Sequence, residues 1–210
     1  MDENKQTTED QILKAAEEVF LKKGFKNAKT SDIAELAGVN NALINYYFRS
    51  KENLFNKVLR SKIELLATSI ISAVNQDLPF LEMMKGLIET QFDFFNANEL
   101  LPRFILSEIL PNEARADMFR NNIVPIILKA GVQLNQRLQE EIEAGRIRDI
   151  NMFDLLYAMT SMNALCFVVK PLVIGGEGNP TMIPFSQIME GRKSKNVEII
   201  MSYLKNTPKP

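Results

Sequence analysis

The sequence predicts an all-α protein, and three observations support this fold class. Apolar residues recur at helical spacing, as in the run Ile12, Ala15, Ala16, Val19 and Phe20. No segment of any length shows the strict alternation of apolar and polar residues that is typical of a β-strand. Glycine, proline and capping residues stand between the periodic segments, where helices are expected to begin and end.

The first expected helix begins near Thr8. Thr8 and Gln11, three residues later, have the spacing of a capping box. Gly24 is expected to end this helix, and Phe25 to fold back onto it as the hydrophobic contact of the C-terminal turn. A much longer apolar stripe begins near Phe55 and predicts a long fourth helix, capped by Ser50.

Two short helices are predicted between these longer ones. Thr30 or Ser31 can cap the segment SDIAELA, and Gly38 stops it. Asn40 or Asn41 can cap the next helix, which is also about two turns long. Short helices joined by a glycine-containing turn after a longer helix fit a helix-turn-helix, although an ordinary corner of a helical bundle fits the same spacing.

The rest of the chain is also predicted to be helical. Pro79 breaks the fourth helix, because the residue before a proline is pushed out of the helical region. Pro125 and Gly131 predict a kink or an interruption. The expected elements are a helix from Phe80, a short helix within 99–110, an interrupted helix over 112–144, a helix from Asp149 or Asn151 that ends before Pro171, a loop over 171–186, and a helix to about Leu204.

Composition excludes several classes of site. The chain contains no histidine, which removes the commonest general base and a common metal ligand. Its single cysteine, Cys166, cannot form an intramolecular disulfide, which fits a reducing compartment. The carboxylates show no spacing that distinguishes a catalytic pair from surface residues. We therefore expect no catalytic residue, metal site or cofactor, and a helical enzyme is the least favoured function.

The amino-terminal residues MDENKQTTED are polar and acidic, so they do not have the pattern of a signal peptide. No uninterrupted apolar run of about 18 residues is present, so no membrane span is expected. We expect a soluble, intracellular protein.

The charge is unevenly distributed, although the net charge is only −1. Residues 1–21 contain two basic and six acidic residues, whereas residues 22–60 contain eight basic and three acidic residues. A basic segment in an otherwise acidic chain points to a polyanionic partner, and a solvated helix face is the alternative.

The segment ILKAAEEVFLKKGFKNAKTSDIAELAGVNNALINYYFRSKENLF resembles the DNA-binding domain of the tetracycline-repressor (TetR) family. The family pattern has an AA…F…G[FY] first helix, then T…IA…AGV, and then a helix running into [YH]F..K..L. The resemblance implies a three-helix DNA-binding domain over 1–50 and a helical effector-binding and dimerisation domain over 51–210. It also implies a cytoplasmic bacterial protein, a homodimer paired through the last two long helices, and a double-stranded, approximately palindromic operator.

The resemblance also assigns residues to DNA contact. Hydroxyl groups, lysine and helix N-termini bind phosphates, whereas asparagine can pair with adenine and alanine can contact a thymine methyl group. Asn45 stands where most family members carry a tyrosine. Arg49 could add a phosphate contact, and a solvated turn is its alternative. The residues expected at the DNA are Thr30, Ser31, Asn40, Asn41, Ala42, Asn45, Tyr46, Tyr47 and Lys51.

An apolar small-molecule effector is expected in the larger domain, where methionine can adapt to an irregular cavity. Ordinary core packing is the alternative for each candidate. The effector-pocket candidates are Met84, Phe92, Phe95, Phe104, Phe119, Asn122, Met162 and Cys166. The predicted function is a dimeric transcriptional repressor released by its effector. The alternatives are an activator and a regulator without a small-molecule effector.

Overall fold

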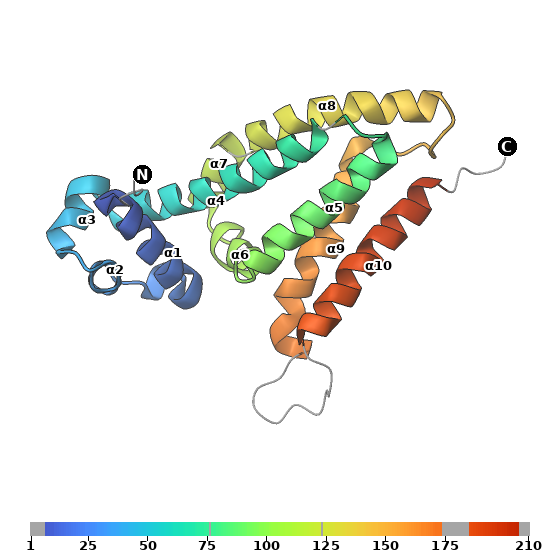
Figure 1. The fold of residues 1–210 in the computed structure, drawn as a ribbon. Coiled ribbons are helices and arrows are strands. Elements are labelled where there is room, and N and C mark those ends of the chain that lie inside the picture. Colours follow the sequence, from blue (N-terminus) through green and yellow to red (C-terminus); the bar gives the residue numbers. More distant parts are fainter. Residues whose placement is uncertain (1–6, 76, 123, 174–184, 206–210) are drawn as a thin grey trace, which may run out of the picture. The chain divides into compact units, whose positions relative to one another are not determined.

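The computed structural model describes residues 7–75, 77–122, 124–173 and 185–205, and within these ranges it contains helices and no strand, which confirms the all-α fold class (Figure 1). The elements are α1 (Thr8–Asn27), α2 (Thr30–Ala37), α3 (Asn41–Phe48), α4 (Lys51–Val74), α5 (Phe80–Ala97), α6 (Leu101–Phe104), the π-helical turn η1 (Ile105–Ile109), α7 (Glu113–Asn122), α8 (Val124–Glu143), α9 (Met152–Val173) and α10 (Phe185–Lys205).

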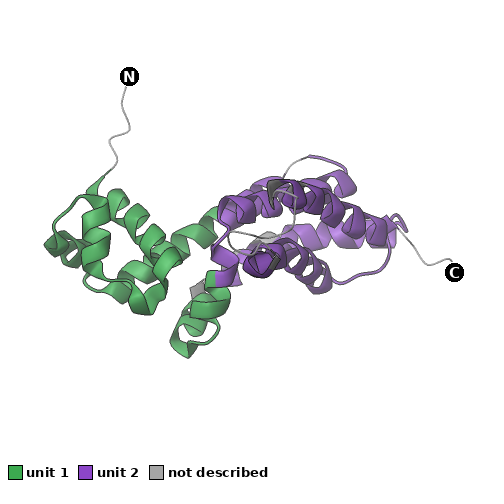
Figure 2. Cartoon of the chain, turned by 90° about the horizontal axis from the view of Figure 1, so that it is seen from below, with its two compact units in different colours: residues 1–65, 104–123 green, residues 66–103, 124–210 purple. Residues whose placement is uncertain are grey.

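The chain divides into two compact units, which are coloured separately in Figure 2. The first unit contains residues 1–65 and 104–123, and the second contains 66–103 and 124–210. The compact first unit therefore includes the first part of α4 and a segment from the middle of the chain. The functional boundary at residue 50 stays a prediction, because compactness and function need not divide a chain at the same residue.

The capping box of α1 lies one residue earlier than predicted. Thr7 is the N-cap, its hydroxyl accepts a hydrogen bond from the Asp10 amide at 3.2 Å, and the Asp10 carboxylate accepts one from the Thr7 amide at 3.2 Å. The choice of Thr8 and Gln11 was wrong because an aspartate at the third helical position closes the same box. Gly24 interrupts the helix as expected, with φ +72° and ψ 166°.

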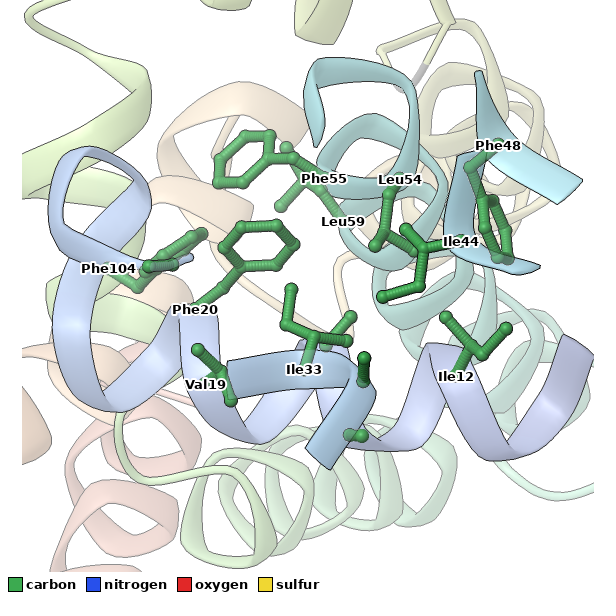
Figure 3. Packing of buried hydrophobic residues seen from close by; sticks show 14 of the residues in the cluster. Ile12, Val19, Phe20, Ile33, Ile44, Phe48, Leu54, Phe55, Leu59 and Phe104 are labelled. Atoms are coloured by element: carbon green, nitrogen blue, oxygen red, sulfur yellow. The ribbon is translucent and has the colours of Figure 1, made fainter. Parts of the chain in front are cut away.

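One apolar core holds the first unit together (Figure 3). Phe55 from α4 packs edge-on against Phe20 and Phe25 of α1, with ring centroids 5.2 and 5.0 Å apart. Phe104, at the end of α6, lies 5.4 Å from Phe55. Ile33 of α2 is buried in the same cluster. Residues from α1, α2, α3, α4, α6 and η1 therefore share one core.

The second unit is built from α5, α8, α9 and α10 with the end of α4. A polar cluster lies inside it. The Asn163 amide donates to the Ile88 carbonyl and to Gln91 Oε1, both at 3.0 Å, and the Asn196 amide donates to Asn163 Oδ1 at 2.9 Å. Gln91 also donates to Thr160 Oγ1 at 3.0 Å. These bonds join α5, α9 and α10.

Several predicted boundaries in the second half of the chain shift. Residue 123, between α7 and α8, lies outside the described residues, so the expected kink or interruption near Pro125 stays a prediction. Gly131 lies inside α8 and does not interrupt it. The prediction that the next helix ends before Pro171 was wrong, because α9 includes this proline in its last turn and ends at Val173. Most of the expected loop, residues 174–184, lies outside the described residues.

Among the described residues, α9 is long and apolar enough over Met152–Leu172 to cross a membrane, by a criterion that concerns only length and composition. The expectation of no membrane span rested on the absence of an uninterrupted apolar run, and polar residues such as Asn163 do interrupt this helix. Asn163 is fully buried and hydrogen-bonded inside the second unit, as expected of a core helix in a folded protein.

We expect Gly24→Ala to lower the free energy of unfolding by about 1–3 kcal/mol, because the backbone conformation of Gly24 is one that other residues adopt only under strain. A Cβ atom there would also lie 2.5 Å from Glu108 Oε1. The matched control is Gly86→Ala inside α5, where a Cβ meets no atom within 4 Å. The control should be neutral or stabilising by about 1 kcal/mol or less. Urea unfolding measures both, and equal stabilities would contradict the expectation.

Candidate nucleic-acid interface

Helices α2 and α3 form a helix-turn-helix in the first unit. Gly38 adopts the left-handed conformation, with φ +66°, and its amide and that of Val39 bond back to the last turn of α2. This turn reverses the chain so that Ile33 of α2 and Ile44 of α3 are both buried in the core of the unit. The opposite face of α3 is left exposed.

That exposed face carries most of the residues predicted to contact DNA. Asn41, Ala42, Asn45, Tyr46 and Tyr47 are all exposed, and Tyr46 is the most exposed large side chain of α3, at 78%. The two tyrosine rings meet edge to face, with centroids 5.2 Å apart. The structure therefore brings hydrogen-bonding amides and two phenols together on one helix surface.

Asn40 is the N-cap of α3, and its Oδ1 accepts a hydrogen bond from the Ala42 amide at 2.8 Å. The choice between Asn40 and Asn41 as the cap is thereby decided for Asn40. Asn40 as a whole is exposed. Capping therefore uses its oxygen and does not exclude contact with a base by its nitrogen.

The start of α2 differs from the prediction. Neither Thr30 nor Ser31 is the N-cap, because Lys29 occupies that position and makes no side-chain cap bond. Asp32 lies in the first turn of this helix, where its carboxylate accepts a hydrogen bond from the Lys23 ammonium at 2.7 Å. A hydrogen bond from the Lys23 ammonium is the main cause that lowers the pKa of Asp32 below its usual value. The Thr30 and Ser31 hydroxyls are therefore not needed as caps.

Lys51 lies in a different environment from the other predicted DNA contacts. Its ammonium group donates to the carbonyl oxygens of Phe25 and Ala28, both at 2.9 Å, and lies 4.3 Å from the centre of the Phe25 ring. These are acceptors at the C-terminal end of α1, where a cation is favourable. A phosphate contact by Lys51 stays a prediction, and it would compete with these bonds.

Much of the positive charge of residues 22–60 is already engaged. Salt bridges occupy Lys22, Lys23, Lys57 and Arg60. By contrast, Lys26, Lys29 and Arg49 are exposed and have no salt bridge within the described part of the chain. Arg49 directly follows α3, and among the described residues it is the one non-glycine residue with a positive φ, at 64°. Lys29 was not among the residues predicted to contact DNA.

The predicted effector residues are divided between the two units, and their role in binding an effector stays a prediction. Met84, Phe92 and Phe95 are buried in the second unit, whereas Phe104 and Phe119 belong to the core of the first unit. The side chain of Asn122 lies outside the described residues.

Met162 and Cys166 do share a surface opening between α9 and α10, with a volume of about 380 Å³. The walls of this opening are mainly apolar, and Arg192 and Lys170 also line it. Within the described ranges no group of three or more acidic, cysteine or histidine side chains gathers as a metal site.

These features define a helical protein with an amino-terminal helix-turn-helix. Residues 12–58 match the family model described as bacterial regulatory proteins, tetR family. The resemblance to the TetR family is therefore confirmed over this segment.

Curated relatives match the same end of the chain. The transcriptional repressor NicS of Pseudomonas putida is 52% identical over 52 residues, which cover 25% of this chain and 24% of NicS. The activator FasR of Mycolicibacterium smegmatis is 31% identical over 84 residues, covering 40% and 38%. The regulator RutR of Escherichia coli K12 is 32% identical over 99 residues, covering 47% and 46%. The matched region thus spans less than half the length of each of these relatives.

Solved structures resemble this chain along nearly its whole length. The fatty acid degradation regulator FadR from Bacillus halodurans superposes with a TM-score of 0.70 at 20% identity, covering 97% of this chain and all of that chain. FadR from Bacillus subtilis, solved with stearoyl-CoA, has a TM-score of 0.68 at 19% identity, covering 92% and 98%. At these identities the likeness shows the fold alone.

We expect Asn40→Ala to cost about 1 kcal/mol of stability, because it removes the oxygen that caps α3. Asn40→Asp should keep nearly all of the stability, since a carboxylate caps equally well and favours a helix N-terminus. Asn41→Ala is the control at the neighbouring exposed position. Chemical denaturation distinguishes the three variants. A loss in Asn40→Ala no larger than in Asn41→Ala would show that the cap contributes nothing.

Proposed function

We propose that this chain is a dimeric, sequence-specific DNA-binding transcriptional regulator. The observation that carries the proposal is the exposed face of α3, which presents Asn41, Asn45, Tyr46 and Tyr47 on a helix-turn-helix inside the segment that matches the tetR family model. Such a helix fits the DNA major groove, where its amide side chains can read base edges. Its phenols can bind phosphates of the DNA backbone beside the groove.

The proposed DNA contacts have two roles. Asn41, Ala42 and Asn45 read bases from the outer face of α3. The Tyr46 and Tyr47 hydroxyls, with Thr30 and Ser31 at the start of α2, hold phosphates and fix the position of the helix on the duplex. Asn40 contributes through its side-chain nitrogen. We add Lys29 and Arg49 as the cations that contact the backbone, because their charges are exposed and have no salt bridge among the described residues.

Dimerisation is supported by apolar side chains that α9 and α10 leave exposed within the second unit. Phe153 and Tyr157 stack one turn apart on α9, with centroids 5.9 Å apart, and Leu165 continues this surface. Ile199 and Tyr203 are exposed on α10. Pairing of these two helices with the same helices of a second copy would bury these side chains. A twofold dimer would place two copies of α3 about one helical turn of DNA apart, so the operator should be an approximate palindrome.

The proposed mechanism is release of the operator by a small-molecule effector that favours a dimer whose α3 helices no longer match the operator spacing. The opening lined by Met162 and Cys166 is one candidate site. Because FadR from Bacillus subtilis was solved in complex with stearoyl-CoA, an acyl thioester is the first compound to add to the operator complex, with free CoA as control.

The relatives include both a repressor and an activator, so activation is an alternative to repression for this chain. Measuring whether transcription rises or falls when the protein is removed distinguishes the two. A regulator without any small-molecule effector is the further alternative, and native mass spectrometry of the purified protein distinguishes it. We propose a cytoplasmic, non-enzymatic role, in keeping with the regulators that this chain resembles.

In a gel-shift titration on the DNA upstream of its own gene, the protein should bind one short palindrome with salt-sensitive affinity. Tyr47→Phe should weaken binding about threefold to tenfold by removing one phosphate hydrogen bond. Lys29→Ala should weaken binding to all sequences and reduce the salt slope by about 1. Lys22→Ala is the control, because that lysine is paired with Glu18 on α1. Binding that is unaffected by the first two substitutions would reject this interface.

If α9 and α10 form the dimer interface, a substitution in it should lower the mass of the protein in solution from that of a dimer to that of a monomer. Tyr157→Glu should turn the dimer into a monomer at micromolar concentration, because it places a charge in the centre of an apolar contact. Leu128→Glu is the control, since Leu128 is equally exposed but lies on α8, outside the proposed interface. Sedimentation velocity measures both. A wild-type monomer, or a dimer that tolerates Tyr157→Glu, would contradict this arrangement.

A further inference from the structure

Among the described residues, Arg115 of α7 is the one charged residue that is buried, and 7% of its surface is exposed. Its guanidinium group donates from Nε to Glu52 Oε1 at 3.2 Å, and from Nη1 to Glu108 Oε2 at 3.1 Å. Nη1 also lies 3.3 Å from the Glu108 carbonyl oxygen. One side chain thus joins the start of α4 to η1, although Glu52 and Arg115 are 63 residues apart.

The same guanidinium lies against two aromatic rings of the core. Its Cζ atom is 3.9 Å from the centre of the Phe25 ring and 4.5 Å from that of Phe55. Phe25 follows the backbone break of α1 at Gly24 and precedes α2, and Lys51 lies over the same ring. Arg115 therefore contacts the corner from which the helix-turn-helix begins.

Glu108, which binds Arg115, also packs closely against Gly24 of α1. Gly24 leaves no room for a Cβ atom, which would lie 2.5 Å from Glu108 Oε1. The carboxylate that binds Arg115 therefore sits directly on the backbone of α1. The contacts of Arg115 thus reach α1, α4 and η1 at one point, and all of them lie within the first unit.

Stability alone does not account for this arrangement. Burying a charge costs several kcal/mol, and well-packed apolar residues often stabilise such a place equally well. A guanidinium differs from an apolar group because its planar donors fix the direction of each partner. The geometry that it holds is that of the α1 corner and the start of α4, which flank the α2–α3 pair.

We propose that Arg115 is a positioning residue for DNA recognition, supplied to the helix-turn-helix by a helix outside the family-matched segment. It holds the Phe25 corner and Glu52 in the arrangement that lets α3 enter the groove at the correct angle. This inference rests on the proposed function, and Arg115 itself contacts no DNA in it.

The test is operator binding by full-length Arg115→Met, Arg115→Lys and Arg120→Met. Methionine keeps the apolar volume and removes the charge, and lysine keeps the charge without the planar fork. Arg120 lies on the same helix but is exposed and paired with Glu113 and Asp117, so Arg120→Met is the matched control. Operator affinity, affinity for unrelated DNA, the salt slope and the thermal midpoint are measured for each.

We expect Arg115→Met to lose about tenfold or more in operator affinity, which corresponds to about 1.4 kcal/mol. Its affinity for unrelated DNA and its salt slope should stay near those of the wild type, because the phosphate-binding groups are still present. Arg115→Lys should recover only part of the loss, and Arg120→Met should stay within about twofold. A merely structural role would instead lower specific and non-specific binding together, in proportion to the unfolded fraction.

Glu108→Gln and Glu52→Gln keep the test decisive if Arg115→Met does not fold. Each is isosteric and removes one charged partner of Arg115. Each should lower the ratio of specific to non-specific affinity, and the double variant should lose less than the two single losses combined, because the partners act through one guanidinium. Unchanged ratios in these variants would overturn the inference and leave the proposed function standing. A wild-type protein that bound no operator would overturn both.

Discussion

The contact on which the first unit depends is the packing of Phe55 against Phe20, Phe25 and Phe104. It makes the first half of α4 part of the same core as α1, and brings a residue from the end of α6 into that core. The α2–α3 pair is too short to be stable alone, since isolated helices of eight residues are marginal in water. Ile33 and Ile44 attach the pair to this shared core, so the surface of α3 is only as well placed as the aromatic cluster beneath it.

Charge in this unit has two separate uses. Lys51 and Arg115 are held against aromatic rings and backbone carbonyls, where they join helices. Lys29 and Arg49 remain at the surface on either side of the α2–α3 pair. A count of basic residues over 22–60 therefore overstates the charge available to a polyanion. The proposed interface relies more on amides, hydroxyls and helix N-termini than on net charge, which suits sequence reading better than non-specific attraction.

The fold class and the helix order could be predicted from the sequence because periodicity and capping are local signals, and the resemblance to the TetR family indicated the residues on the exposed face of α3. The same local signals placed a break at Gly24 and narrowed the cap of α3 to Asn40 or Asn41. The sequence could not predict the contacts of Lys51, whose acceptors come from α1, or those of Arg115, whose partners lie on α4 and η1. The division of the effector candidates between two units could not be predicted for the same reason, since Phe104 and Phe119 share their apolar character with Phe92 but pack in the core of the first unit. Apolar periodicity shows that a side chain is buried without showing what it is buried against.

Each of the two units contains a buried, hydrogen-bonded side chain that restricts how its apolar helices can pack. Apolar stripes allow neighbouring helices to slide past one another by a turn at little cost, whereas a buried polar group must keep its partners. In the second unit, Asn163 ties the apolar helix α9 to Ile88 and Gln91 of α5 and to Asn196 of α10. In the first unit, Arg115 ties α7 to Glu52 and Glu108. In both cases one buried hydrogen-bonding side chain selects a single register among helices that are distant in sequence. A protein that must present α3 to DNA at a fixed angle requires such a register more than it requires additional stability.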